Sequence, residues 1–417
     1  MSPRAESSAS FTREEKLTLA SLVVVVGFLA AVVFHYWQGA YEGAHYPHDT
    51  YLFRPSDTLH FVEPVGTRRH SFSDLLAVCI HARARRPYSA AIPAPEGAWR
   101  PFPSNYPPLG AMIAWPLTLV PYRWAIAAFL TGSVAVMVAF GWRWFRVGKP
   151  ALDAIHIVAL CLMPYPVHVL LDRGNIEIAV FAALAVGAAF LARRRCGPAA
   201  GALGTAVALK IFPAVYLPLL LHRCGRRGVA VCVGVVAVTS CLALLGMASP
   251  PGESVQRMMQ ALLGFSGKMD ESLNAATLSS GLYAPVAVVG WYAETYPSLR
   301  PLAAVLRTSY PALAVALFAG AAWLTLAGRL RLWEAATLAT LCMVALPKAS
   351  PDYRLIHLLI PLALFVHSRV PRRIGIAVTT LFALLLVPKA WLWIAPEVSI
   401  GAVVNPACMV ALAGVVV

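Results

Sequence analysis

The chain has 417 residues, of which 59% are hydrophobic and only 13% are charged. A soluble globular protein is about half apolar and about a quarter charged, so this composition excludes a soluble protein and indicates a polytopic membrane protein. The formal net charge of +15 would suit nucleic-acid binding, but Lys and Arg cluster in short segments between apolar stretches, which is the positive-inside pattern of membrane proteins. We therefore predict a lipid bilayer as partner and no nucleic acid.

The apolar stretches predict an all-α fold. A helix needs about 20 apolar residues to cross a bilayer, so the chain has room for roughly 10 to 13 transmembrane or re-entrant helices. We expect residues 1–417 to form a single transmembrane domain. The eight Cys residues show no disulfide framework and no zinc spacing. The sequence carries no metal or nucleotide motif, and we predict neither a metal nor another cofactor.

The first span is predicted over residues 17–37, and it is followed by a long polar interval, residues 38–105. We expect this interval to be a first outer loop. Within it, Ser73 and Asp74 open a short helical pattern that ends at Pro87, with Ser73 as N-cap and Asp74 in the first turn. One face of this helix is apolar, which is typical of a helix that lies on the membrane; that face consists of Leu75, Val78, Cys79 and Ala82.

The segment 197–221 decides the topology of the centre. It lies between two basic loops, residues 193–195 and 222–228, and a single span would place one of them outside. Two short helices that meet near Lys210, close to Pro213, would keep both loops inside. Broken helices at membrane depth are tolerated where they line a cavity or pack within the protein.

The remaining spans follow the same scheme. They are predicted over residues 122–142, 151–171, 176–192, 228–248, 301–327, 333–346, 355–366, 373–388 and 399–417. Residues 249–300 form a second outer region. Every basic loop after residue 140 then lies inside, provided that residues 106–120 are re-entrant or otherwise partial.

Ionisable residues gather on the predicted outer side. Together with the uncharged polar residues beside them, they are Asp49, Asp57, Glu63, Asp74, Arg173, Asn175, Lys210, Lys348, Ser350, Asp352, Tyr353, Arg354 and His357. Ionisable groups at membrane depth are costly and mark substrate paths. A carboxylate among such cations could deprotonate an acceptor hydroxyl while the cations hold a departing phosphate.

Simpler roles remain open for several of these residues. Asp74 could only cap its helix, and Arg173 could extend to the interface. Asp352 and Arg354 could form a loop ion pair of little energetic value. Lys210 is the hardest to explain structurally, because it lies in the middle of an apolar segment beside a helix break.

Four pieces of the sequence carry a resemblance. They are Asp74 through Arg86-Pro87-Tyr88, NYPPLGAMIAWPL (105–117), DRGNIE followed by GALGTAVALKIFPAVYLPLLL (172–221), and SPDYRLIHLLIPLAL (350–364). Together they resemble the integral-membrane glycosyltransferases of the GT-C superfamily. The sequence is most similar to glycosyltransferase family 87, the polyprenyl-phosphate-mannose-dependent mannosyltransferases.

The resemblance implies a GT-C-like helical fold and an inverting transfer with a loop-one Asp as general base. Asp74 matches that Asp by its distance to Pro87-Tyr88, although the stretch around Asp57 also resembles a loop-one motif. Asp57 therefore stays a second candidate. The resemblance also matches Arg173, Asn175 and Lys210 to motif positions near the donor. The full set of predicted substrate-binding residues is Tyr106, Arg173, Asn175, Lys210, Lys348, Ser350, Asp352, Tyr353 and His357.

We therefore predict a membrane glycosyltransferase that moves a hexose, in the first instance mannose, from a polyprenyl-phosphate sugar to a lipid-linked or cell-envelope glycan acceptor. The alternative is a transporter or flippase of a lipid-linked or small anionic solute. The Ala, Val, Arg and Pro content suggests a GC-rich bacterial genome. A bacterial plasma membrane, with the active site on its outer face, follows from that hypothesis.

Overall fold

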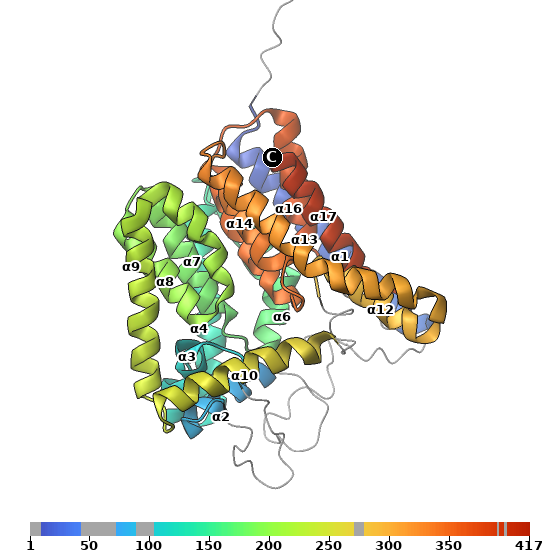
Figure 1. The fold of residues 1–417 in the computed structure, drawn as a ribbon. Helices are drawn as coiled ribbons and strands as arrows, with labels where there is room; N and C mark the ends of the chain where they lie inside the picture. Colours follow the sequence, from blue (N-terminus) through green and yellow to red (C-terminus); the bar gives the residue numbers. More distant parts are fainter. Residues whose placement is uncertain (1–9, 43–71, 89–103, 271–278, 390–391, 396–397) are drawn as a thin grey trace, which may run out of the picture.

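The computed structural model describes residues 10–42, 72–88, 104–270, 279–389, 392–395 and 398–417 (Figure 1). The first half contains α1 (Arg13–Glu42), α2 (Ser73–Ala84), α3 (Pro108–Met112), η2 (Trp115–Leu119), α4 (Tyr122–Trp144), α5 (Pro150–Ile157), η3 (Val158–Leu162), α6 (Tyr165–Arg173), α7 (Glu177–Ala192), α8 (Cys196–Leu209), η4 (Phe212–Tyr216) and α9 (Leu217–Leu245). The second half contains α10 (Pro251–Asp270), α12 (Ala284–Thr295), η5 (Pro297–Leu299), α13 (Arg300–Leu326), α14 (Leu332–Ala345), η6 (Asp352–Leu358), α15 (Leu359–Val366), α16 (Arg372–Leu386) and α17 (Gly401–Val416). The short strands β1 (Trp393–Ala395) and β2 (Val398–Ser399) pair antiparallel.

The fold is all-α, as predicted, and several helices are long and apolar enough to cross a membrane. Within the described residues these are Arg13–Phe34, Tyr122–Trp144, Phe212–Leu245 and Pro297–Leu326. The third of them is interrupted at Gly225, whose backbone angles are not helical (φ 64°, ψ −171°). A fifth crossing is possible where Pro150–Leu162 and Tyr165–Arg173 meet at a bend of 56°. Shorter apolar helices, among them α7, α8, α14 and α17, accompany these spans. The protein is therefore a polytopic integral membrane protein.

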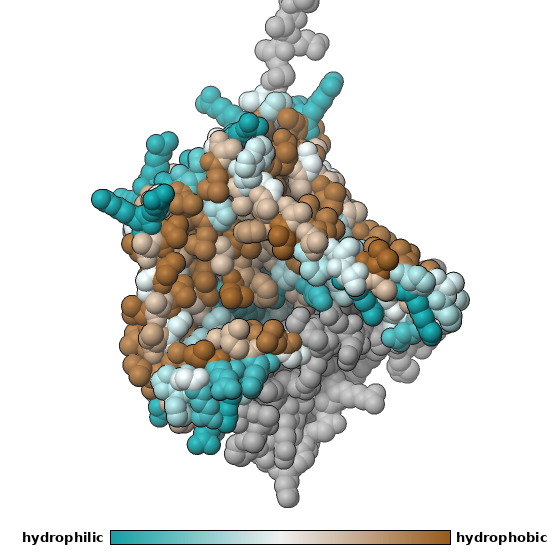
Figure 2. All heavy atoms as spheres, in the orientation of Figure 1, coloured by the Kyte–Doolittle hydropathy of each residue, from teal (hydrophilic) through white to brown (hydrophobic). Residues whose placement is uncertain are grey.

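The basic segments gather at one end of the helices, as the positive-inside pattern predicts. Lys149 binds Glu14 at the start of α1, with 2.7 Å between Nζ and Oε1. At the same end, the Arg331 guanidinium donates to the carbonyl of Arg369 at 3.1 Å. Figure 2 shows hydrophilic side chains at the upper end of the molecule and a hydrophobic belt below them.

The segment around Lys210 forms a broken hairpin, as predicted. Helix α8 ends at Leu209, Lys210 is extended (φ −148°, ψ 139°), and η4 and α9 turn back. Pro213 contributes to the break because it lacks the N–H that a continuing helix needs. The disulfide between Cys196 and Cys224 joins the two ends of the hairpin that lie farthest from Lys210, with 5.4 Å between their Cα atoms. Our expectation that the Cys residues form no disulfide framework was wrong for this pair, whose spacing matches no sequence motif.

Helices α2, α3 and α10 lie at the opposite end of the bundle from the basic segments (Figure 1). The predicted apolar face of α2 is buried: Leu75, Val78, Cys79 and Ala82 are each less than 9% exposed. The N-cap, however, is Phe72 in a left-handed conformation (φ 52°), so Ser73 is the first helical residue and not the cap. Residues 106–120 form no spanning helix, as predicted, because α3 and η2 are each only five residues long.

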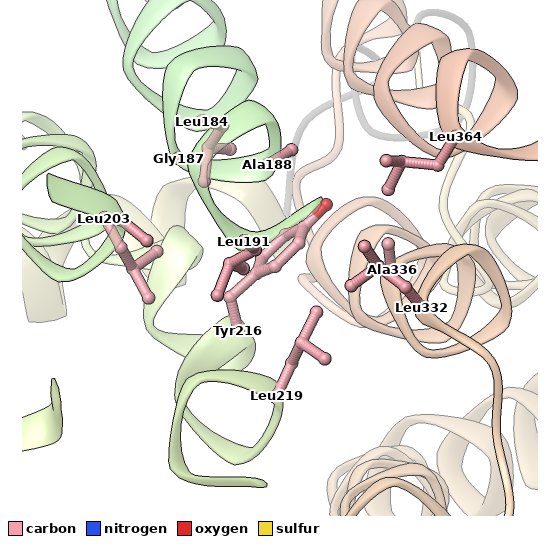
Figure 3. Close-up of a pocket in the computed structure, with 11 residues that line it drawn as sticks. Leu184, Gly187, Ala188, Leu191, Leu203, Tyr216, Leu219, Leu332, Ala336 and Leu364 are labelled. Carbon is pink, nitrogen blue, oxygen red and sulfur yellow. The ribbon is translucent and has the colours of Figure 1, made fainter. Parts of the chain in front are cut away.

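A small apolar cavity lies between α7, α8, η4, α9, α14 and α15 (Figure 3). Its lining is aliphatic apart from Tyr216, whose hydroxyl is already bonded to Thr340 Oγ1 at 2.6 Å. A sugar or a phosphate needs several polar partners, so this cavity is a packing gap and not the substrate site.

Gly110 tests how closely α3 must approach the hairpin. A Cβ atom there would lie 2.1 Å from the carbonyl oxygen of Leu209, next to Lys210. We expect Gly110→Ala to cost about 1–3 kcal/mol of stability, the usual penalty of overpacking. Thermal unfolding of the purified protein in detergent measures this.

The matched control is Gly132→Ala on α4, where a Cβ meets no atom within 4 Å. That change should be neutral or stabilising by about 0.5–1 kcal/mol, because Ala is the better helix former. Equal melting temperatures for the two variants would contradict the close approach of α3.

Candidate active site

The turn between α6 and α7 brings three polar side chains together. Arg173 donates to both oxygens of Asp74, from Nε to Oδ2 at 3.0 Å and from Nη2 to Oδ1 at 2.7 Å. Asn175 Nδ2 donates to Oδ2 at 2.6 Å. Gly174 between them has φ 65°, and a Cβ there would lie 2.7 Å from Leu75 Cβ. Only glycine satisfies both the backbone conformation and the close approach of α2.

Asp74 is held as a carboxylate. Burial alone would raise the pKa of Asp74. The guanidinium of Arg173 and the hydrogen bonds from Arg173 and Asn175 lower it by more than burial raises it, so the pKa lies below its ordinary value. A carboxylate has about four lone-pair positions. Oδ2 accepts two hydrogen bonds and Oδ1 accepts one, so Oδ1 retains a position for another donor.

A second group of hydrogen bonds continues from Asn175 into the bundle. Asn175 Oδ1 accepts from Lys210 Nζ at 3.1 Å and from the backbone N–H of Glu177 at 2.9 Å. The Glu177 carboxylate binds Lys210 Nζ at 2.5 Å and His357 Nε2 at 2.7 Å. Asp74 on α2 is thus connected to His357 on η6 through three intervening side chains.

Two aromatic rings flank the ammonium group of Lys210. Its Nζ lies 5.0 Å from the ring centroid of Tyr106 and 5.4 Å from that of Tyr353. These are cation–π distances, which favour a charged lysine. Lys210 itself is only 4% exposed, so its charge depends on these rings and on Glu177.

The structure brings most of the predicted site residues into this one cluster. Its predicted members are Asp74, Tyr106, Arg173, Asn175, Lys210, Tyr353 and His357. Asp57 lies outside the described residues. Lys348 is placed elsewhere, with Nζ 5.5 Å from the ring of Tyr283.

Ser350 and Asp352 belong to a different buried group. Asp352 accepts a hydrogen bond from Ser280, which in turn accepts one from Asn405 at 2.8 Å. The Ser350 N–H donates to Ser279 Oγ at 3.3 Å. The alternative of an ion pair between Asp352 and Arg354 is not what the structure shows, because Arg354 donates to the carbonyl of Ala349 and Asp352 accepts from Ser280.

Glu177 is the functional candidate that the sequence analysis missed. It is 3% exposed and contacts both Lys210 and His357. The signal was present in the sequence: a lysine inside an apolar segment needs a carboxylate partner, and Glu177 follows Asn175 within DRGNIE. Its position at the predicted start of a span made it look like a boundary residue.

The fold and this cluster define a helical membrane protein with a buried polar site near one end of its helices. Residues 105–351, more than half of the chain, match glycosyltransferase family 87, and the chain belongs to that family. It is therefore a membrane glycosyltransferase, acting on a sugar donor and an acceptor, and the transporter alternative is not favoured. No curated protein and no solved structure matches the chain.

The matched range contains only part of the cluster. Arg173, Asn175, Glu177 and Lys210 lie within it, whereas Asp74 precedes it and the cluster residues of η6 follow it. Hydrogen bonds to Asn175 and Glu177 link both outlying parts to the matched core.

Glu177→Gln should destabilise the protein strongly. The change keeps the shape of the side chain but leaves Lys210 buried without a counter-charge, and breaking a buried pair on one side costs about 3–5 kcal/mol. Thermal unfolding in detergent measures the loss. Glu14→Gln, in the exposed pair with Lys149, is the control and should change stability little.

A double variant measures how much Glu177 and Lys210 stabilise each other. Glu177→Gln combined with Lys210→Met removes both charges, so its unfolding temperature should recover part of the loss. Strictly additive losses would show that Glu177 and Lys210 do not stabilise each other.

Proposed function

We propose that the protein is an inverting glycosyltransferase that moves a hexose, in the first instance mannose, from a polyprenyl-phosphate sugar to a lipid-linked or cell-envelope glycan acceptor. The observation that carries the proposal is the state of Asp74. Its carboxylate pairs with the guanidinium of Arg173 and accepts from Asn175, yet Oδ1 retains an open acceptor position.

Asp74 acts as the general base. The acceptor hydroxyl donates its hydrogen bond to Oδ1 and passes its proton there as the oxygen attacks the anomeric carbon. The new glycosidic bond forms on the face opposite the departing phosphate, so the configuration inverts. Asp57 remains the second candidate for the base.

Arg173 and Asn175 position the carboxylate. Because three hydrogen bonds fix its two oxygens, its orientation needs no reorganisation when the acceptor arrives. The rings of Tyr106 and Tyr353 lie beside the ammonium group of Lys210, which donates to Asn175.

The positive-inside rule supports a site on the outer face of the membrane. The basic segments lie at one end of the bundle, and α2 and α10 lie at the other (Figure 1). A donor on a lipid carrier reaches such a site from the bilayer. The composition favours a bacterial plasma membrane.

Asp74→Asn should reduce sugar transfer by about 10²–10⁴-fold, the usual contribution of a general base. The assay uses purified protein in nanodiscs, radiolabelled polyprenyl-phosphate mannose and an envelope-lipid extract as acceptor. Asp153→Asn is a matched control, because it neutralises a buried carboxylate that accepts from the Val147 N–H, outside the cluster.

The comparison with Asp57→Asn separates the two candidate bases. Loss of transfer only with Asp57→Asn would keep the reaction and reassign the base. A folded wild-type protein that transfers no sugar from any of several lipid-phosphate donors would contradict the proposed donor class.

Arg173→Gln should move the acidic limb of the pH–rate profile to higher pH. Arg173 lowers the pKa of Asp74, so its removal raises that pKa, and the base becomes protonated at a pH where the wild type is still ionised. Transfer rates measured across acidic pH test this. An unchanged limb would mean that Asp74 is not the titrating base.

A further inference from the structure

Arg354 is the cation that the site does not neutralise internally. Arg173 is paired with Asp74, and Lys210 is paired with Glu177. Within the part of the chain that the structure describes, no carboxylate forms an ion pair with Arg354. The two carboxylates of the cluster are thus matched by Arg173 and Lys210, so the guanidinium of Arg354 adds one positive charge that no carboxylate balances.

The guanidinium of Arg354 is buried and oriented. The residue is 7% exposed, and its guanidinium carbon lies 4.0 Å from the ring centroid of Phe212, two residues after Lys210. Nη1 donates to the carbonyl of Ala349 at 2.7 Å. Nε is buried and has no hydrogen-bond partner among the described residues.

The helical type of η6 directs Arg354 toward the site. A 3-10 helix has three residues per turn, so residues i and i+3 lie on the same side. Arg354 therefore shares a side of η6 with His357, which binds Glu177. Arg354 also lies close enough to Glu177 and Lys210 to act electrostatically on both.

A buried unpaired guanidinium with an idle donor is costly, because desolvation of an ion is offset only by a partner charge and hydrogen bonds. A planar guanidinium fork is suited to phosphate oxygens. We propose that Arg354 is the phosphate ligand of this site and binds the phosphate of a lipid phosphate, which, in the function proposed above, belongs to the sugar donor.

The charge of the cluster fits a single phosphate. A lipid-phosphate sugar is a phosphodiester with one negative charge, which balances the excess of one. During transfer, the acceptor oxygen forms its bond to the anomeric carbon and its proton goes to Asp74. The bond from that carbon to the phosphate oxygen breaks, and its electron pair stays on the phosphate. Arg354 then faces the additional charge that develops on the leaving lipid phosphate.

The test measures binding and not turnover. Full-length protein in detergent is titrated with farnesyl phosphate, and binding is followed by intrinsic tryptophan fluorescence and by the shift in melting temperature. Arg354→Gln should weaken binding about 10- to 100-fold, the range for one charged hydrogen-bonding partner. Arg354→Lys keeps the positive charge but loses the planar pair of N–H donors, so its affinity for farnesyl phosphate should lie between those of the wild type and Arg354→Gln.

Three controls make the result specific. Farnesol, which lacks the phosphate, should bind the wild type and Arg354→Gln alike. Arg257→Gln, in the exposed pair with Glu253 on α10, should bind farnesyl phosphate like the wild type. Inorganic phosphate should bind more weakly than farnesyl phosphate, and equal binding would overturn the assignment to a lipid phosphate.

Equal affinities of the wild type and Arg354→Gln for farnesyl phosphate would overturn the proposal, as would an equal loss in Arg257→Gln. If Arg354→Gln fails to fold, Arg354→Lys decides the question, with wild-type affinity counting against the proposal. Phosphate binding through Arg354 without any sugar transfer would contradict the proposed function alone. Transfer that needs Asp74, with normal binding in Arg354→Gln, would contradict this inference alone.

Discussion

The buried ion pair between Glu177 and Lys210 is the interaction on which the site depends. Lys210 stands at a helix break inside an apolar hairpin, where an uncompensated ammonium would cost several kcal/mol. Glu177 supplies the counter-charge at 2.5 Å and also holds His357 at 2.7 Å. One carboxylate therefore ties the start of α7, the tip of the α8–η4 hairpin and η6 to one another.

The same pair fixes the orientation of Asn175. Lys210 Nζ and the N–H of Glu177 can only donate, so the amide oxygen of Asn175 must face them. Its amide nitrogen is then directed at Asp74 Oδ2. The orientation of Asn175, one of the two residues that position the proposed base, is thus set from inside the bundle by groups that do not contact the base.

The sequence predicted the all-α fold, apolar spans such as those at Arg13–Phe34 and Tyr122–Trp144, and the two short helices around Lys210. Apolar length, basic loops and a proline act locally, so they can be read from the sequence. The buried face of α2 was predictable for the same reason. It did not predict the disulfide of Cys196 with Cys224 or the pairing of Glu177. Both depend on which helix ends meet in space, and a single sequence contains no direct record of such contacts.

The segment from Ser350 to His357 shows where sequence reasoning fails most clearly. As a loop, its polar residues would be expected to act together. The segment instead forms the 3-10 helix η6, in which only residues three apart share a side. Arg354 and His357 therefore lie on one side of η6 and Asp352 on another. Asp352 is therefore bonded to Ser280, while the two basic residues lie toward Glu177 and Lys210. The excess positive charge of the cluster exists only because this turn separates a carboxylate from its neighbouring guanidinium.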